Sequence, residues 1–320
     1  MMQTKALYNL LRMQAADDPS LPAEDWAIED LRKVKIDEIF SRLKKRNVDL
    51  DKKAFIQFAE NCDTPEDLAE LLSSEEEDEK LYDSFYLLVF ELWRRLLPEK
   101  QSLSIFGDEL DVRIELYDHE ELESDEQIQD ALANLLEILE ENSDAGAEPQ
   151  EVLAAIGDYC AHDMESFIVD YISDILDSEN EAYASELIEG FAPYVSEVAW
   201  FDFLKARLES FKNVAAANRN IRKILEKESD PSLILEILRF LTGSGEHDLF
   251  VLSVKKILPL LKQEEELLEV MEIAADYYRR LDQDEVEQSI QKLMQKRKSA
   301  TGPLHPSDLV LKSFGQIITQ

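Results

Sequence analysis

Two histidine–aspartate pairs, His162-Asp163 and His247-Asp248, are the residues of this sequence best suited to metal-dependent hydrolysis. A metal phosphohydrolase combines such a pair with further His and Asp ligands from other helices. The convergence of His119, His162 and His247 with several acids in one pocket would favour that chemistry. However, the chain has only four histidines, and Asp163 and Asp248 also suit the first turn of a helix, where acids are favoured. We expect acidic helix starts here and keep a metal-dependent hydrolase as an alternative.

The two cysteines, Cys62 and Cys160, are too few for a disulfide framework or a thiolate zinc site. Cys160 precedes His162 by two residues, and residues at this spacing do not face each other on a helix. The pair is therefore unsuited to act as a nucleophile and its base, and Cys160 is expected in a core. Cysteine usage of this kind fits a reducing compartment, so a cytoplasmic location is predicted.

Other sequence motifs for catalysis or ligand binding are absent. The sequence has no Gly-rich phosphate loop, no Gly-x-Ser-x-Gly and no His-Glu-x-x-His. The stretch that begins at Asp177 lacks the glycine and the final carboxylate of a calcium loop, because Ala182 and Ile188 occupy those positions. The basic run at 296–298 is expected to be a solvated helix end. We therefore predict no enzyme activity and no cofactor or metal.

Acidic residues are concentrated in the middle third of the chain. The formal net charge is −36, from 70 Asp and Glu against 34 Lys and Arg. Residues 101–200 contain 28 acids and a single base, Arg113, a net of −27. Such a surface keeps a protein in solution and repels nucleic acid and anionic lipid. It also suits the attraction of a basic protein partner, or the imitation of nucleic-acid phosphates if the carboxylates are evenly spaced on one face. The residues chosen to represent the partner-binding surface are Glu120, Glu121, Glu123, Asp125 and Glu126.

Composition predicts a mostly helical, all-α protein. The chain has 8 Gly and 10 Pro, and 45% of its residues are apolar, which provides enough material for one or two cores with few turns. The longest apolar stretch, residues 85–90, is far shorter than the roughly 20 residues of a membrane span. No secretory signal is recognisable in residues 1–20. We therefore expect no membrane insertion.

Several helices are predicted from their start signals and apolar spacing. Thr64-Pro65 combines a capping residue with proline at the first helical position. Residues 81–97 form the most apolar segment and are expected to be a core helix. Residues 26–45 are predicted as one helix, and residues 103–117 as another, although part of the latter alternates like a strand. Residues 124–127 have the residue types of a capping box.

An internal repeat marks the C-terminal half. The segment at 220–225 recurs at 253–258 and again at 289–294, at offsets of 33 and 36 residues. Helix pairs that recur near 34 residues indicate a helical solenoid, in which each pair buries its apolar face against its neighbours. Ile224, Ile257 and Leu293 are therefore expected at equivalent buried positions.

These repeats resemble the tetratricopeptide family. Ala275-Asp276-Tyr277-Tyr278-Arg279-Arg280 is similar to the end of that family's first helix, and Gly245-Glu246-His247-Asp248 is similar to its turn. The resemblance covers residues 200–299. It implies stacked helical hairpins and a concave groove, lined by the first helices, that grips peptides or partner helices. On the family's pattern, the residues facing the groove are Asp202, Arg239, Tyr278 and Arg279.

Three regions follow from these observations. Residues 1–145 are predicted as an N-terminal helical bundle, 146–299 as tetratricopeptide-like repeats, and 300–320 as a flexible tail able to dock back on the solenoid or on a partner. The predicted function is that of a non-catalytic adaptor, scaffold or chaperone-like protein that binds a protein partner. Alternatives are a chaperone or regulator of protein secretion, a metal-dependent hydrolase and an acidic nucleic-acid mimic. The sequence leaves the oligomeric state open.

Overall fold

The computed structural model describes residues 2–73, 78–297, 302–305 and 308–318. Helices contain 75% of these residues, and no strand occurs among them apart from one isolated bridge between Gln263 and Pro303. The prediction of an all-α protein is therefore confirmed. Segment 103–117, the one ambiguous case, is also helical.

Contact clustering divides the chain into two compact units, which are described separately. Unit 1 contains residues 1–167 and 193–195, and unit 2 contains residues 168–192 and 196–320. The division falls inside helix α10, later in the chain than the boundary suggested at residue 145. Within the described residues, no helix has both the length and the apolar character needed to cross a lipid bilayer.

Unit 1 contains nine α-helices in its described residues and the start of a tenth. They are α1 (Thr4–Asp17), α2 (Asp25–Ile28), α3 (Ile36–Lys45), α4 (Lys52–Ala59), α5 (Pro65–Leu72), α6 (Glu79–Leu96), α7 (Leu103–Asp118), α8 (Glu126–Asp144), α9 (Pro149–Gly157) and the first residues of α10 (Met164–Asp177). A short 3₁₀ helix, η1 (Leu31–Lys33), follows α2.

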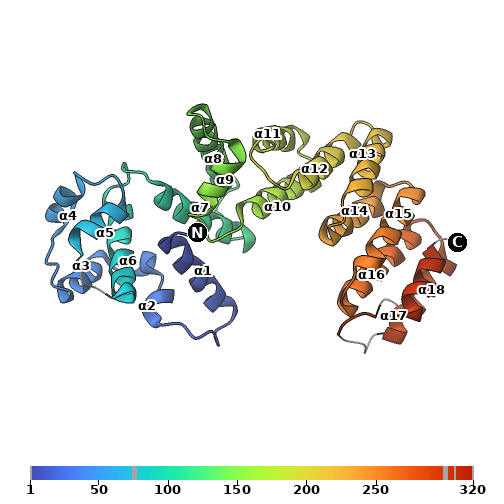
Figure 1. Ribbon diagram of the computed structural model, residues 1–320, viewed down its shortest axis with the longest axis horizontal. Helices are drawn as coiled ribbons and strands as arrows, with labels where there is room; N and C mark the ends of the chain where they lie inside the picture. The colour runs from blue at the N-terminus through green and yellow to red at the C-terminus, as the bar shows by residue number, and fades with distance from the viewer. Residues whose placement is uncertain (1, 74–77, 298–301, 306–307, 319–320) are drawn as a thin grey trace. The chain divides into compact units, whose positions relative to one another are not determined.

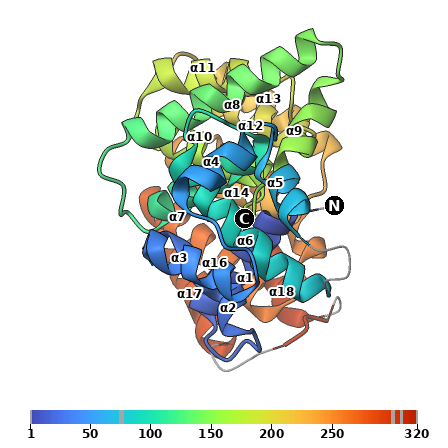
Figure 2. The same cartoon turned by 90° about the vertical axis from the view of Figure 1, so that its left-hand side faces the viewer.

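The apolar helix α6 is the centre of the first core in unit 1. Helices α3 and α5 pack against it (Figures 1 and 2), and its side chains from Phe85 to Trp93 are buried. The predicted start of α5 is confirmed: Thr64 accepts a hydrogen bond from Asp67 N, and Asp67 completes the capping box by accepting from Thr64 N. Local capping and an apolar face thus specify these helices, as expected from their sequence.

Two local predictions in unit 1 are wrong. Residues 26–45 do not form one helix but three pieces, α2, η1 and α3. The Asp30 carboxylate accepts a hydrogen bond from Arg32 N, which starts a new helical turn and breaks the first one. The capping box expected at residues 124–127 is also absent: α8 begins at Glu126, and its N-cap Asp125 makes no side-chain capping bond.

Unit 2 is built from helical hairpins that pack in succession. Its helices are the rest of α10, α11 (Glu181–Phe191), α12 (Val198–Ser210), α13 (Val214–Lys227), α14 (Pro231–Ser244), α15 (His247–Ile257), η2 (Leu258–Leu260), α16 (Glu264–Arg280), α17 (Asp284–Arg297) and α18 (Leu309–Ile318). Helices α12 and α13, α14 and α15, and α16 and α17 each form a hairpin (Figure 1). We call α12, α14 and α16 the first helices and α13, α15 and α17 the second helices.

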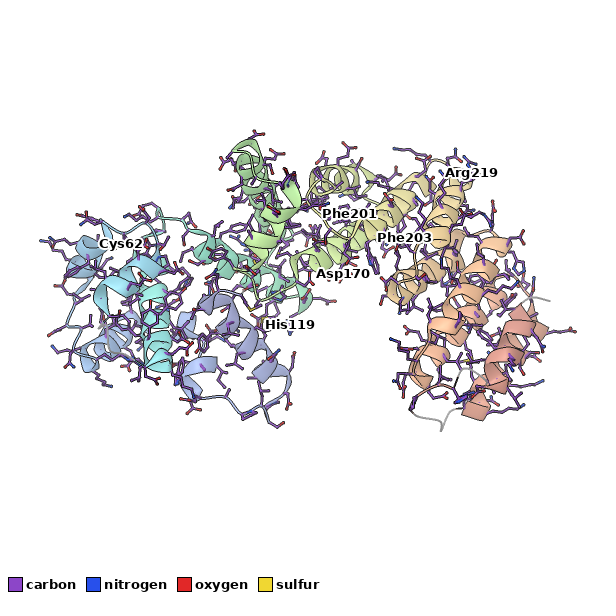
Figure 3. All side chains as sticks on the ribbon, in the orientation of Figure 1. Cys62, His119, Asp170, Phe201, Phe203 and Arg219 are labelled. Carbon is purple, nitrogen blue, oxygen red and sulfur yellow. The ribbon has the colours of Figure 1, made fainter. Side chains whose placement is uncertain are left out.

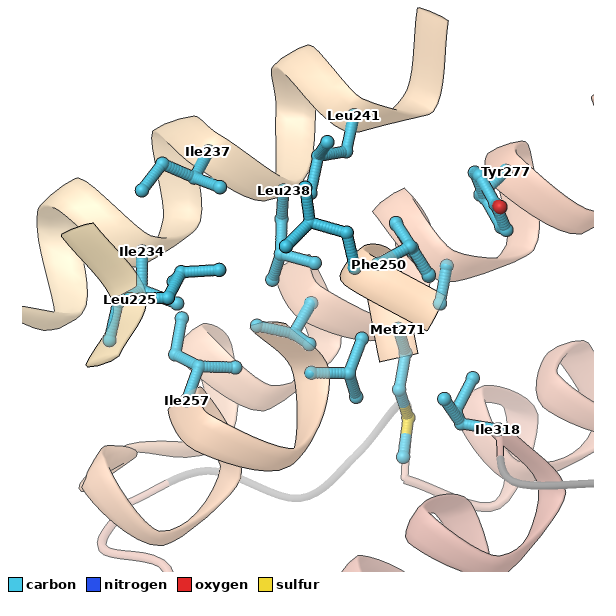
Figure 4. Packing of buried hydrophobic residues seen from close by; sticks show 14 of the residues in the cluster. Leu225, Ile234, Ile237, Leu238, Leu241, Phe250, Ile257, Met271, Tyr277 and Ile318 are labelled. Atoms are coloured by element: carbon cyan, nitrogen blue, oxygen red, sulfur yellow. The ribbon is translucent and has the colours of Figure 1, made fainter. Parts of the chain in front are cut away.

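The three hairpins share one apolar core. The first helices contact each other in order, and α13 contacts α15. Ile224, Ile257 and Leu293 are all buried in the same cluster, with exposed fractions of 7%, 1% and 9%. Figure 4 shows the centre of this cluster, where Leu238 and Phe250 lie among side chains from several helices. The predicted stacking of helix pairs and the burial of the three repeat residues are confirmed, and both are compatible with a helical-repeat solenoid.

The C-terminal segment is not a free tail where it is described. Residues 309–318 form α18, which packs against α15 and α17. Phe314 and Ile318 are buried in the core of the hairpins. Before α18, Leu304 N donates a hydrogen bond to Lys262 O, and Arg297 forms an ion pair with Asp308. Of the expectation for residues 300–320, docking back on the solenoid holds for this helix, whereas a flexible tail does not, because its apolar side chains gain more from burial than from exposure to water.

Candidate functional site

An open depression of about 570 Å³ lies over the first helices of unit 2. Its lining comes from α14, α16 and the end of α10: Asp177, Arg239, Phe240, Thr242, Gly243, Glu272, Ile273, Asp276 and Arg280. Phe240 and Ile273 are partly buried and pack against the core below. The depression therefore offers two apolar side chains among charges of both signs, a surface suited to a polypeptide. We call it the first-helix depression.

Ion pairs connect the helices that line the first-helix depression. The Arg239 guanidinium pairs with Glu236 on its own helix and with Glu269 on α16. On α16, the Arg280 Nε lies 2.8 Å from an Asp276 oxygen. These side chains are partly exposed, so each pair contributes little to stability. Their charges remain available to a partner at the surface.

Three of the four predicted groove residues are exposed, and one prediction is wrong. Arg239 lines the first-helix depression, whereas Asp202 and Arg279 are exposed on first helices but do not line it. Tyr278 is only 2% exposed, and its hydroxyl donates a hydrogen bond to Ile318 O at 3.1 Å. Helix α18 covers Tyr278, and this burial raises the pKa of its hydroxyl to about 12. Tyr278 is thus a core residue and is unavailable to a ligand.

The acidic residues predicted to attract a partner lie on the surface of unit 1. The five carboxylates predicted to attract a partner are all exposed: four lie in the connection between α7 and α8, and Glu126 is the first residue of α8. Within that connection Glu120 has a φ of 57°, in the left-handed region. Along α8, five exposed acids share the face opposite the buried apolar residues, because their spacing stays close to whole helical turns. They are Glu126, Asp130, Glu137, Glu141 and Asp144.

The histidine–aspartate pairs are placed differently from each other. His162, in unit 1, lies with its Nδ1 3.0 Å from the Asp111 carboxylate, which also accepts hydrogen bonds from the backbone of Ala161 and His162. His247, in unit 2, stacks on the ring of Tyr277. Within the described ranges, no group of three or more His, Cys, Asp or Glu side chains is arranged to hold a metal ion. His162 therefore belongs to a hydrogen-bonded network centred on Asp111.

This network continues through α1 and α7 inside unit 1. Asn9 donates hydrogen bonds to both Asp108 and Asp111, each 1% exposed. Asp108 also forms ion pairs with Lys5 at 2.7 Å and Arg32 at 2.5 Å. Burial by itself would raise the pKa of Asp108, but the charges of Lys5 and Arg32 outweigh it and lower the pKa to about 2. Asp108 thus stays ionised, and the hydrogen bonds of Asn9 to both buried aspartates join α1 to α7.

The cysteines are buried and unreactive in character. Both Cys62 and Cys160 are free thiols in the core, as expected for Cys160. Burial raises the pKa of each thiol, and for Cys160 the nearby Asp111 raises it further. A raised pKa keeps a thiol protonated, and the protonated form is a poor nucleophile.

Sequence reasoning missed several residues of these sites. Phe240 and Ile273 are adjacent to the core positions of their helices, so their apolar character alone suggested burial. Asp108 and Asp111 lie in a segment rich in acids, so the sequence does not distinguish these two buried residues from the exposed acids around them. A usable signal was Gly107 inside an apolar helix, because a glycine there suggests a close approach of another backbone. A Cβ at Gly107 would lie 2.2 Å from Tyr159 O.

Comparisons with known proteins give no match. No protein-family profile matches the chain, and neither curated proteins nor solved structures show significant similarity to it.

Proposed function

We propose that this protein is a non-catalytic adaptor or scaffold that binds another protein through the first-helix depression of a tetratricopeptide-like solenoid. The observation that carries this proposal is the depression itself. It exposes Phe240 and Ile273 between the charges of Arg239, Asp276 and Arg280. Partly exposed apolar side chains ringed by charges are typical of a surface that binds a peptide or a helix. A chaperone-like role or a role in protein secretion uses the same depression, and a cytoplasmic location remains a prediction.

The exposed acids of unit 1 support a second contribution, the attraction of a basic partner. The part of unit 1 from residue 101 to residue 167 contains 20 acids and one base, a net charge of −19. Such a field raises the rate at which an oppositely charged partner arrives, and salt weakens it as the Debye length falls to about 3 Å near 1 M. Contacts inside a depression instead control how fast the partner leaves. The two surfaces are therefore separable by kinetics.

The first experiment identifies the partner and tests the depression. Affinity capture from the native cell at low and high salt provides a partner, whose binding rates are then measured on an immobilised surface. Arg239→Glu with Ile273→Ser should speed dissociation about tenfold, equivalent to about 1.4 kcal/mol. Lys292→Glu, an exposed position on second helix α17, is the matched control and should change nothing. Dissociation unaltered by the double substitution would refute the role of the depression.

The second experiment tests attraction by the acidic surface. Changing the five chosen carboxylates to Gln or Asn should slow association at low salt and leave dissociation unchanged. The list of changes is Glu120→Gln, Glu121→Gln, Glu123→Gln, Asp125→Asn and Glu126→Gln. Association that is independent both of salt and of these changes would mean that the acids serve only solubility.

A row of carboxylates on one face of α8 favours one second candidate function, imitation of a nucleic-acid backbone. The five acids on this exposed face extend along the helix from Glu126 to Asp144, and phosphates also form a row of negative charge. A mimic of this kind competes with duplex DNA or RNA for a captured partner. If the partner binds nucleic acid and the wild-type chain displaces it, Glu137→Gln with Glu141→Gln should weaken that displacement. A partner without nucleic-acid affinity would exclude the mimic.

A further inference from the structure

The second helix α13 is basic in a strongly acidic chain. It contains four basic residues and one acidic residue. Arg219, Arg222 and Lys223 form no ion pair with any residue that the structure describes, and Figure 3 shows Arg219 on α13. Elsewhere in unit 2, Arg207 and Arg239 each hold a carboxylate. Helix α13 therefore presents three cations that are not paired with a carboxylate of the described residues.

A hollow of about 400 Å³ lies beside these cations, where α13 packs against α15. Its lining consists of Arg222, His247, Asp248, Val251, Leu252, Lys255 and Ile318. Arg222 is half-buried, and Lys255 is exposed without an ion pair to any described residue. The neighbouring Lys256 is already engaged, since its amine donates to Leu225 O. Two cations without an ion pair to a described residue, together with the single carboxylate of Asp248, thus border the apolar side chains of Val251, Leu252 and Ile318.

We propose that this hollow, the second-helix hollow, binds a short acidic segment of another protein with an apolar side chain at its centre. A guanidinium pairs with a carboxylate through two parallel hydrogen bonds, and an ammonium adds a second point of attraction. Val251 and Leu252 can bury an apolar side chain of the segment, and this removal of apolar surface from water favours binding. The hollow therefore recognises the segment through two kinds of contact, ion pairs with its carboxylates and apolar packing with its central side chain.

Charge argues for a short peptide over other anionic partners. The chain as a whole is at −36, so its field repels a nucleic acid, an anionic bilayer and a second copy of itself. A peptide with a few carboxylates experiences little of this repulsion, because fields beyond about 10 Å are largely screened at 0.1 M salt. Its contacts with Arg222 and Lys255 lie well within that range. The proposal concerns the second helices and is independent of the first-helix depression.

The test uses a defined probe, a fluorescein-labelled peptide of sequence Glu-Glu-Leu-Glu-Asp with blocked ends. Its binding to the full chain is followed by fluorescence anisotropy. Arg222→Glu with Lys255→Glu should weaken binding at least about tenfold, and about 1 M salt should weaken it similarly. Lys212→Glu with Lys292→Glu, two exposed lysines of unit 2 outside the hollow, makes the same change in net charge and should leave binding intact.

Two altered peptides separate the parts of the recognition. A peptide with Ser in place of Leu should bind more weakly if the apolar residues of the hollow take part, and so should a peptide with Gln and Asn in place of the acids. The double substitution Val251→Ser with Leu252→Ser should reduce the preference for the Leu peptide. Thermal unfolding of each variant checks that the helices are retained.

Several results would overturn the proposal. An equal loss of peptide affinity in the hollow variant and in the matched control would mean that the peptide responds only to the net charge of the chain. If the acidic peptide does not bind to the wild-type chain, the proposed peptide site is refuted. Binding of anionic vesicles or of an oligonucleotide that depends on Arg222 and Lys255, without peptide binding, would assign the hollow to a different class of ligand. Self-association abolished by the same two substitutions would assign it to a second copy.

Discussion

Unit 1 buries acidic side chains between its helices, whereas the hairpins of unit 2 meet through a shared apolar cluster. In unit 1, Asp108 and Asp111 lie at the contact of α1 and α7 and are both 1% exposed. In unit 2, the contacts between hairpins come from residues such as Leu238, Phe250 and Met271. A buried charge requires its partners in place, while apolar packing tolerates many arrangements of similar volume. The two units should therefore fail in different ways when one side chain is removed.

The largest effect is expected from breaking the buried charge network. Asp108→Ala leaves the cations of Lys5 and Arg32 without their buried partner, and the loss of one member of a buried ion pair costs about 3–5 kcal/mol. Denaturant unfolding measures the loss, and hydrogen exchange should locate it in unit 1. Glu137→Ala, at an exposed acid of α8, is the control. A loss below about 1 kcal/mol would show that the network is not needed for stability.

A cavity in the apolar cluster of unit 2 should have the next largest effect. Leu238 is fully buried between hairpins, and Leu→Ala in a core costs about 2–5 kcal/mol. Hydrogen exchange should rise in α14 and in the helices packed on it, α15 and α16. Leu309→Ala provides the comparison, since Leu309 is 77% exposed on α18. Exchange confined to α14 would contradict a shared core.

Substitutions of two glycines test how closely the helices pack in each unit. Gly107→Ala places a Cβ 2.2 Å from Tyr159 O in unit 1, so the helices must separate, at a cost of about 1–3 kcal/mol. Gly243, in α14 of unit 2, has open space at the same position. Gly243→Ala should instead raise stability by up to about 1 kcal/mol, because alanine favours the helix. Thermal unfolding checks both, and a harmless Gly107→Ala would contradict the close contact.

Acidification should weaken unit 1 through Asp108. Its pKa in the folded chain is about 2, below the usual value of about 3.9 in an unfolded chain. The network therefore stabilises the fold fully above about pH 4 and loses its contribution as the pH falls towards about 2, a change of about 2 kcal/mol. The difference in unfolding free energy between the wild type and Asp108→Asn isolates this effect from the other acids. A difference that is constant with pH would contradict it.

Local signals and repeated patterns were sufficient to predict much of the fold. The cap at Thr64 and the apolar face of α6 depend on residues near in sequence, so both were recognisable. The burial of Ile224, Ile257 and Leu293 followed from their recurrence, because equivalent residues in stacked hairpins have equivalent neighbours. The first-helix depression was anticipated only through Arg239.

What escaped prediction depends on contacts between distant segments. Tyr278 has the sequence context of a groove residue, but α18 covers it from 40 residues further along the chain. Asp108 and Asp111 look like surface acids until α1 and the connection before α10 bring Asn9 and His162 to them. A short sequence pattern does not predict the burial of Tyr278 or of the two aspartates, because the segments that cover them are brought close only by the complete fold.

Helix α18 also has a consequence for how this chain can be extended in space. A stack of hairpins is open-ended by construction, and its last member presents an apolar edge on which a further hairpin, from the same or another molecule, can add. Here Phe314 and Ile318 fill that edge at α15 and α17. The apolar surface that Phe314 and Ile318 cover is therefore closed to a further hairpin.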